Sequence, residues 1–179
     1  MIKIMKNIIL ITTFYLILFF NLEQYTFATD DDHDFDSKIP MSIEEVYEVQ
    51  GYLKGIDKKV KEFENKYDAV VKLPEKMPFK VNKKFARIAE DDTLSLHFIG
   101  EDQKDLFQIT INPNKPLEEE TNYTLDNGKK VYFEVIHPSN MSGIMQLYIK
   151  IEKFEYILGM KINEKYNKET LINVTESIN

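Results

Sequence analysis

Acidic residues near the start of the chain are the first group whose spacing could bind a metal. Asp32, Asp34 and Asp36 alternate as the first ligands of an EF-hand calcium loop do. The match ends there, because Ser37 stands where that loop needs glycine and Ile43 stands where its bidentate glutamate belongs. We therefore expect only weak, nonspecific cation binding at this run, and we assign no metal ligand.

The three histidines are the residues best suited to proton transfer near neutral pH. His33 lies among the aspartates, His97 falls on the polar side of an alternating strand, and His137 precedes Pro138 at a strand end. A metal site or an acid–base pair made by His97 and His137 would need their two strands to be neighbours. Our default interpretation is that these histidines lie on the surface.

Neighbouring glutamates could supply the two carboxylates of a glycosidase. Glu44–Glu45 and Glu118–Glu120 are such groups, but a glycosidase holds its carboxylates roughly 5–10 Å apart in a pocket. Nothing in the sequence builds that pocket, so solvated charge is the favoured interpretation. The chain also lacks a Gly-x-Ser-x-Gly elbow, a Ser-x-x-Lys or His-Glu-x-x-His motif and a glycine-rich phosphate loop. We assign no catalytic residue, no cofactor-binding residue and no cofactor.

Tyrosines in the predicted strands are better candidates for a functional surface. They are Tyr123, Tyr132, Tyr148 and Tyr156, and some of them must point away from the core. An amphipathic ring with a hydrogen-bonding tip suits a protein, peptide or glycan partner. The alternative is that tyrosine occurs here for its β propensity alone. Both interpretations stay open on the sequence alone.

The first 28 residues have the features of a cleavable signal peptide. Lys3 and Lys6 precede an apolar run at 8–20, roughly thirteen residues, which is the length of a signal core and too short to span a bilayer. Ala28 follows at the predicted cleavage site. We expect export to the outside of the cell, with membrane contact only through this segment. The alternative is a signal anchor that is never cut.

Composition limits the class of partner and the way the chain is stabilised. The chain has 23 basic and 30 acidic residues, a net charge of −7, and Arg87 is its only arginine. This charge disfavours nucleic acid as a partner. The chain has no cysteine, so no disulfide stabilises it and no lipid can be attached through a thiol. A core rich in phenylalanine and tyrosine must hold the domain together.

An amphipathic helix is predicted over 42–67. Ser42 and Glu45 form a capping box at its start. A stripe with helical spacing follows, made of Val46, Val49, Leu53, Ile56, Val60, Phe63 and Tyr67. Gly51 and Gly55 indicate a bend in this helix. We expect the stripe to pack on the chain's own sheet in a monomer; the alternative is a coiled-coil or partner-binding seam.

The remainder predicts an antiparallel sheet and a closing helix. The strand region is 73–162, with Asp126-Asn127-Gly128 as a tight turn, and Asn167 caps a helix at 167–178. The fold class is therefore α+β: an antiparallel sheet with one face covered by the N-terminal amphipathic helix and the short C-terminal helix. The predicted organisation is a signal peptide at 1–28, an acidic disordered linker at 29–40 and a single domain at 41–179.

One resemblance rests on the order of motifs in this region. A proline-flanked entry is followed by the hairpin Tyr-Thr-Leu-Asp-Asn-Gly, then by Leu-Tyr-Ile-Lys-Ile-Glu-Lys-Phe-Glu-Tyr-Ile-Leu-Gly and a helix ending in Ser-Ile. Residues 74–179 in this order resemble the uncharacterised extracytoplasmic domains that follow signal peptides or membrane anchors in bacilli and clostridia. The resemblance implies a secreted or cell-surface protein of Gram-positive type, and no chemistry.

These observations together favour one class of function. We expect a secreted or cell-envelope, non-enzymatic binding protein of unknown ligand, with a protein, peptide or glycan at the cell surface as partner. The alternatives are a secreted hydrolase that uses carboxylates and a carrier of an apolar ligand between helix and sheet.

Overall fold

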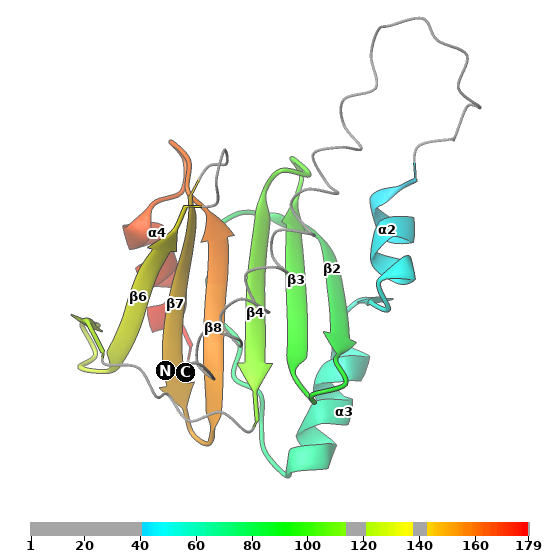
Figure 1. Ribbon diagram of the computed structural model, residues 1–179, viewed down its shortest axis with the longest axis horizontal. Helices are drawn as coiled ribbons and strands as arrows, with labels where there is room; N and C mark the ends of the chain where they lie inside the picture. Colours follow the sequence, from blue (N-terminus) through cyan, green and yellow to red (C-terminus); the bar gives the residue numbers. More distant parts are fainter. Residues whose placement is uncertain (1–40, 114–120, 138–142, 179) are drawn as a thin grey trace, which may run out of the picture. The chain divides into compact units, whose positions relative to one another are not determined.

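A computed structural model of the protein describes residues 41–113, 121–137 and 143–178 (Figure 1). The predicted signal peptide and linker, with His33 and the aspartates at 32, 34 and 36, lie outside the described residues, and so do Glu118–Glu120. The chain divides into two compact units, Met1–Val46 and Tyr47–Asn179. The second unit contains every strand of the sheet.

The elements come in the order α2 (Ile43–Val49), β1 (Leu53–Lys54), α3 (Asp57–Tyr67), β2 (Val81–Ile88), β3 (Leu94–Gly100), β4 (Leu106–Asn112), β5 (Tyr123–Thr124), β6 (Lys130–Ile136), β7 (Ile144–Ile151), β8 (Phe154–Lys161) and α4 (Lys168–Glu176). Strands β2 to β8 follow one another along the chain with no helix between them in the described residues. The strands form one antiparallel sheet in the order β1-β2-β3-β4-β8-β7-β6-β5. The predicted α+β class and the antiparallel sheet are confirmed.

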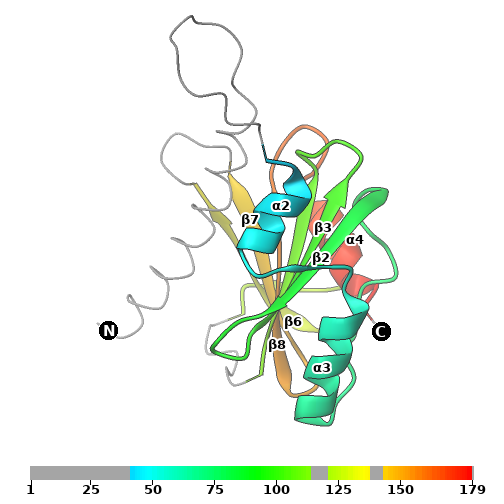
Figure 2. The same cartoon turned by 90° about the vertical axis from the view of Figure 1, so that its right-hand side faces the viewer.

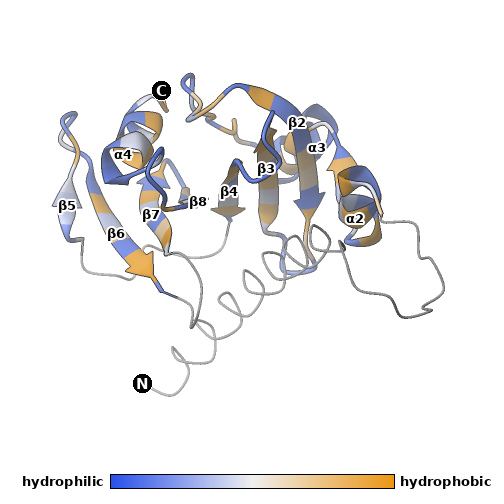
Figure 3. Cartoon of the chain, turned by 90° about the horizontal axis from the view of Figure 1, so that it is seen from above, coloured by the Kyte–Doolittle hydropathy of each residue, from blue (hydrophilic) through white to orange (hydrophobic). Residues whose placement is uncertain are grey.

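One face of the sheet, here called the first face, carries the hydrophobic core. In register across it lie Leu96, Ile109, Leu158 and Leu147, all completely buried. Helix α3 packs against β2 and β3, and α4 packs against β7 and β8. Figures 2 and 3 show α3 and α4 on the same side of the strands. Both helices contribute to one core cluster with the first face, through Phe63 and Leu171 among others.

The helix predicted over 42–67 differs in the structure, which divides it into α2, the short strand β1 and α3. Gly51 and Gly55 adopt left-handed φ angles of 79° and 82°, and two such residues in one turn of chain end a right-handed helix. The predicted stripe is therefore broken. Val49 is 79% exposed and Leu53 is 41% exposed, whereas Phe63 on α3 is completely buried.

Several local signals in the sequence are confirmed. Ser42 and Glu45 form the predicted reciprocal capping box, which also holds the pKa of the Glu45 carboxyl below its usual value. Asn167 caps α4 by accepting a hydrogen bond from the backbone N–H of Thr170. The tight turn before β6 has Gly128 at φ 81°, where glycine avoids the strain that a side chain would cause.

Replacing Phe63 with alanine tests whether α3 belongs to the core of its own unit. Loss of the buried ring should lower the free energy of unfolding by about 3–5 kcal/mol. Lys61→Ala, on the exposed side of the same helix, should change it by less than about 0.5 kcal/mol. Urea unfolding measures both variants, and sedimentation gives their oligomeric state. Unchanged stability of Phe63→Ala together with loss of a wild-type dimer would instead show a partner-binding seam.

Candidate functional site

The opposite side of the sheet, here called the second face, differs in character from the first. Its middle is a row of residues in register that we call the polar row: His97, Gln108, Gly159, Gln146 and Glu134. Beside it lies a second row, here called the tyrosine row: Ser95, Thr110, Ile157, Tyr148 and Tyr132. Because directly paired residues of a sheet point to the same side, these ten residues on five strands all lie on the second face. Thr110, Tyr132 and Glu134 are half-buried, and the other seven are buried.

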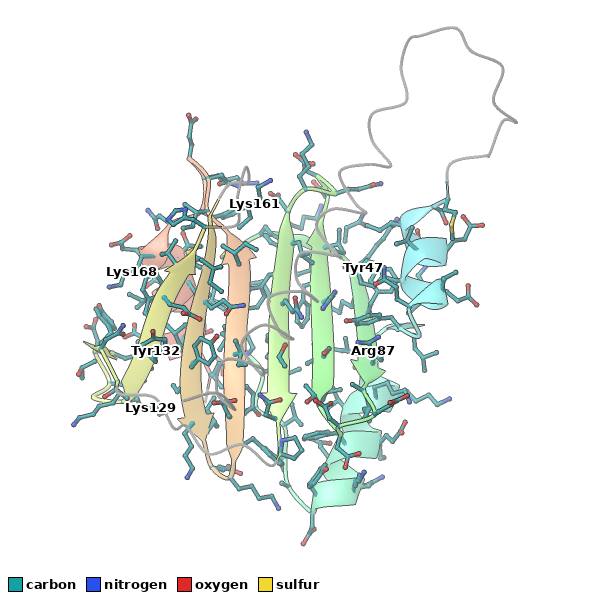
Figure 4. All side chains as sticks on the ribbon, in the orientation of Figure 1. Tyr47, Arg87, Lys129, Tyr132, Lys161 and Lys168 are labelled. Carbon is teal, nitrogen blue, oxygen red and sulfur yellow. The ribbon has the colours of Figure 1, made fainter. Side chains whose placement is uncertain are left out.

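Two of the four predicted tyrosines lie together on the second face. The rings of Tyr132 and Tyr148 meet edge to face, with 5.7 Å between centroids and 62° between planes. The Tyr148 hydroxyl lies 2.7 Å from Glu134 Oε1 and 2.7 Å from Gln146 Oε1. A hydroxyl has one proton to donate, so it can satisfy only one of these two acceptors at a time. Figure 4 shows Tyr132 on β6, across the sheet from Arg87 on β2.

The other two tyrosines belong to the first face, in agreement with the expectation that only some of the four point away from the core. Tyr156 is completely buried, and its hydroxyl accepts a hydrogen bond from the backbone N–H of Lys72 at 3.0 Å. Burial raises the pKa of this hydroxyl to about 12. Tyr123 packs under α4, where Lys168 Nζ lies 4.2 Å from its ring centroid. The position of each tyrosine within its strand's alternation, and not its residue type, decides its face.

His97 is buried at one end of the polar row, so the prediction of a surface position is wrong. Its Nδ1 lies 3.0 Å from the Tyr47 hydroxyl and its Nε2 lies 3.2 Å from the Tyr52 hydroxyl. The Tyr47 ring in turn stacks on Phe85, with centroids 4.1 Å apart. Burial, and secondly the charge of Arg87, lower the pKa of His97 to about 3. A neutral imidazole has one donor and one acceptor, so one tyrosine accepts from it and the other donates to it.

Arg87, on strand β2, lies at this end of the second face. Its guanidinium lies 4.8 Å from the centroid of the Tyr52 ring, and its Nη1 donates to the Gln50 carbonyl at 2.9 Å. The chain's one arginine thus fastens the segment between α2 and β1 to strand β2. The network of His97, Tyr47 and Tyr52 is part of the same attachment. Its neutral, buried histidine has a structural role and gives no sign of acid–base catalysis.

The hypothesis of a His97–His137 pair is wrong. His97 lies on β3 and His137 follows β6, with β4, β8 and β7 between them. Four strand spacings of about 4.8 Å separate the two by roughly 19 Å. His137 instead lies against Gly143, where a Cβ atom would come 2.9 Å from its Cε1.

The described residues give little support to a hydrolytic or metal-binding site. Glu45 is engaged in the helix cap, so the Glu44–Glu45 pair is part of a helix start. Glu155 lies on the second face beyond the tyrosine row, where it accepts a hydrogen bond from Asn112 Nδ2 at 2.8 Å. Within residues 41–113, 121–137 and 143–178, no group of three or more histidine or acidic side chains could hold a metal ion. In the same ranges, no helix has the length and apolar character to cross a membrane.

Sequence reasoning missed the two glutamines and the glycine that distinguish the polar row. Gln108 and Gln146 belong to strands β4 and β7, and Gly159 on β8 lies between them. The alternation of each strand places them on the polar side, but the sheet order that brings them together is not a local signal. No family model matches the chain, and no curated protein or solved structure shows a significant match to it.

The burial of His97 predicts a specific pH dependence of stability. The unfolded chain binds a proton at this residue near pH 6.5, whereas the folded protein binds it at about pH 3. Between these values the unfolded state binds more protons, so stability falls as the pH falls, by up to about 1.4 kcal/mol per pH unit. Urea unfolding at about pH 7 and about pH 5.5 measures this loss, above the range where most carboxylates titrate.

Two histidine variants identify which residue causes this change of stability with pH. His97→Gln should be less stable at neutral pH but should show little change between the two pH values, because glutamine does not titrate. His137→Gln should keep the wild-type slope. An unchanged slope in His97→Gln would show that another group causes the pH dependence.

Proposed function

We propose that the protein is a secreted or cell-envelope binding protein without catalytic activity, and that its second face contacts the ligand. The observation that carries this proposal is the contrast between the two sides of one sheet. The first face is apolar and packs against α3 and α4. The second face carries amides, hydroxyls and paired tyrosine rings in register across five strands.

The chemistry of the second face supports recognition. A sheet face that is simply in contact with solvent usually carries charged and β-branched residues. Among the ten residues of the two rows, Glu134 is the one carboxylate, and Arg87 on β2, in register with Ser95, is the basic residue beside them. Tyrosine rings and neutral amides are typical of surfaces that bind a partner, since they combine contact area with directed hydrogen bonds. A hydrolase would need a second carboxylate beside Glu134, and the two rows supply none.

Export is the second part of the proposal and rests on the sequence. The basic start at Lys3 and Lys6, the short apolar run at 8–20 and Ala28 support a signal peptide cleaved near residue 28. The chain has no cysteine, so it can work in an oxidising environment without thiol chemistry. The apolar side of α3 is used within its own unit, at Phe63, which supports a monomer.

Retention of the purified protein on envelopes isolated from the producing cells tests the proposal. Tyr132→Ala removes a half-buried ring from the tyrosine row. We expect it to weaken retention roughly tenfold or more, the size of effect seen for aromatic contacts at the centre of an interface. Val135→Ala changes an exposed residue of the same strand, 38% accessible, on the opposite face, and should leave retention unchanged. Equal retention of wild type and both variants would contradict the proposal.

A further inference from the structure

We infer that Asn127 is a site of spontaneous chemical modification, where the side-chain amide is lost and the residue becomes aspartate or isoaspartate. This inference goes beyond the proposed function and does not depend on it. It is carried by the turn that joins β5 to β6. That turn combines an exposed asparagine, a glycine after it, and a backbone N–H that already binds the oxygen on which charge would develop.

The residue after Asn127 is the first of these features. Asn127 is the one asparagine of the whole sequence that is followed by glycine. In this modification the backbone nitrogen of the following residue attacks the side-chain carbonyl carbon, so a side chain on that residue hinders the attack. Gly128 has none. A Cβ atom placed there would meet no described atom within 4 Å outside the adjacent residues, so the approach to this nitrogen is open.

The Asn127 side chain is held by a hydrogen bond that favours the reaction. Its Oδ1 accepts from the backbone N–H of Lys129 at 3.0 Å, a bond that asparagine commonly makes to the backbone two residues ahead. Attack on Cγ moves negative charge onto Oδ1. A donor already directed at that oxygen stabilises the charge, as the N–H groups of an oxyanion hole do. Figure 4 shows Lys129 in this turn, at the margin of the sheet.

The reaction needs no partner other than water. The Gly128 nitrogen gives its proton to solvent and forms a bond to Asn127 Cγ. The bond between Cγ and Nδ2 then breaks, and Nδ2 takes up a proton and leaves as ammonia. The product is a five-membered imide ring, which water opens at either carbonyl. Cleavage between the nitrogen and Cγ gives aspartate, whereas cleavage between the nitrogen and the backbone carbonyl carbon gives isoaspartate, in which the chain continues through Cγ.

One hydrogen bond within the turn controls the rate. The Gly128 N–H donates to the Leu125 carbonyl at 2.9 Å, and this bond must open before the nitrogen can attack. Residues 126–130 are all exposed, and local opening of an exposed turn costs little free energy. We therefore expect a modification that accumulates with the age of the protein.

The modification changes a point where the β5–β6 hairpin is attached to α4. The Asp126 N–H donates to Glu176 Oε1 at 2.7 Å, and the Leu125 N–H donates to the Lys129 carbonyl at 2.9 Å, which closes the turn. Aspartate at 127 adds a carboxylate near those of Asp126 and Glu176, and like charges repel. Isoaspartate lengthens the backbone inside the closed turn by one atom. Both products should loosen the hairpin.

Incubation of the purified protein, followed by peptide mapping with mass spectrometry, tests the inference. Asn163 is a matched control in the same molecule, because it is exposed and its Oδ1 accepts from the Lys165 N–H at 2.8 Å, but glutamate follows it. Asn127 should lose its amide at a rate roughly tenfold or more above that of Asn163. The rate should rise with pH, because the attacking nitrogen must lose its proton. Fragmentation of the peptides should find both aspartate and isoaspartate at 127.

Asn127→Ser removes the reacting carbonyl and tests the structural consequence. During the same incubation the melting temperature of the wild type should fall as the modification proceeds, whereas that of Asn127→Ser should stay constant. Equal rates of amide loss at Asn127 and Asn163 would overturn the inference. Aspartate without isoaspartate at 127 would also overturn it, because direct hydrolysis of the side-chain amide gives aspartate alone. Neither outcome depends on whether the second face binds a ligand.

Discussion

The strict alternation of side chains along antiparallel strands is the constraint on which the rest of the structure depends. In β7, Leu147 points into the core beside Leu158 of β8, and its neighbour Gln146 points to the other side beside Gly159. The same division holds in β3, β4 and β8, so the core and the candidate binding surface are built from the same strands. The packing of α3 and α4 on the first face therefore also fixes the positions of the polar groups on the second. A shift of register by one residue would exchange the two surfaces and destroy both.

The sequence pattern predicted the strands and the α+β class because the alternation is a local property of each strand. The same reliance on local patterns explains the two predictions that were wrong, the continuous helix over 42–67 and the surface position of His97. The heptad-like stripe over 42–67 is real in the sequence, but two left-handed glycines, Gly51 and Gly55, end the helix within it. Once the chain turns there, Tyr47 and Tyr52 reach His97, and a residue expected at the surface becomes buried. The spacing of residues in the sequence does not predict either contact, because each depends on where the chain around β1 packs against the edge of the sheet.

The candidate site was predictable only in part for a related reason. Tyr132 and Tyr148 were among the tyrosines expected on an outer face, and they do lie together there. Tyr123 and Tyr156, chosen on residue type alone, lie on the core side. The polar row depends on sheet order: β8 lies between β4 and β7, although two strands separate β4 from β7 along the chain. Only this long-range pairing places Gln108, Gly159 and Gln146 side by side, where Gln146 Nε2 has no hydrogen-bond partner within the described part of the chain.

The central claim is that the first face forms the core and the second face contacts the ligand. Footprinting by hydroxyl radicals on the envelope-bound protein tests this claim most directly. Oxidation at each residue is compared by mass spectrometry between free and bound protein. The account predicts reduced oxidation of Tyr132 on the second face and unchanged oxidation of Val135, which lies further along the same strand on the opposite face. Protection of Val135 or of the outer side of α3, with Tyr132 oxidised equally in both states, would contradict the claim.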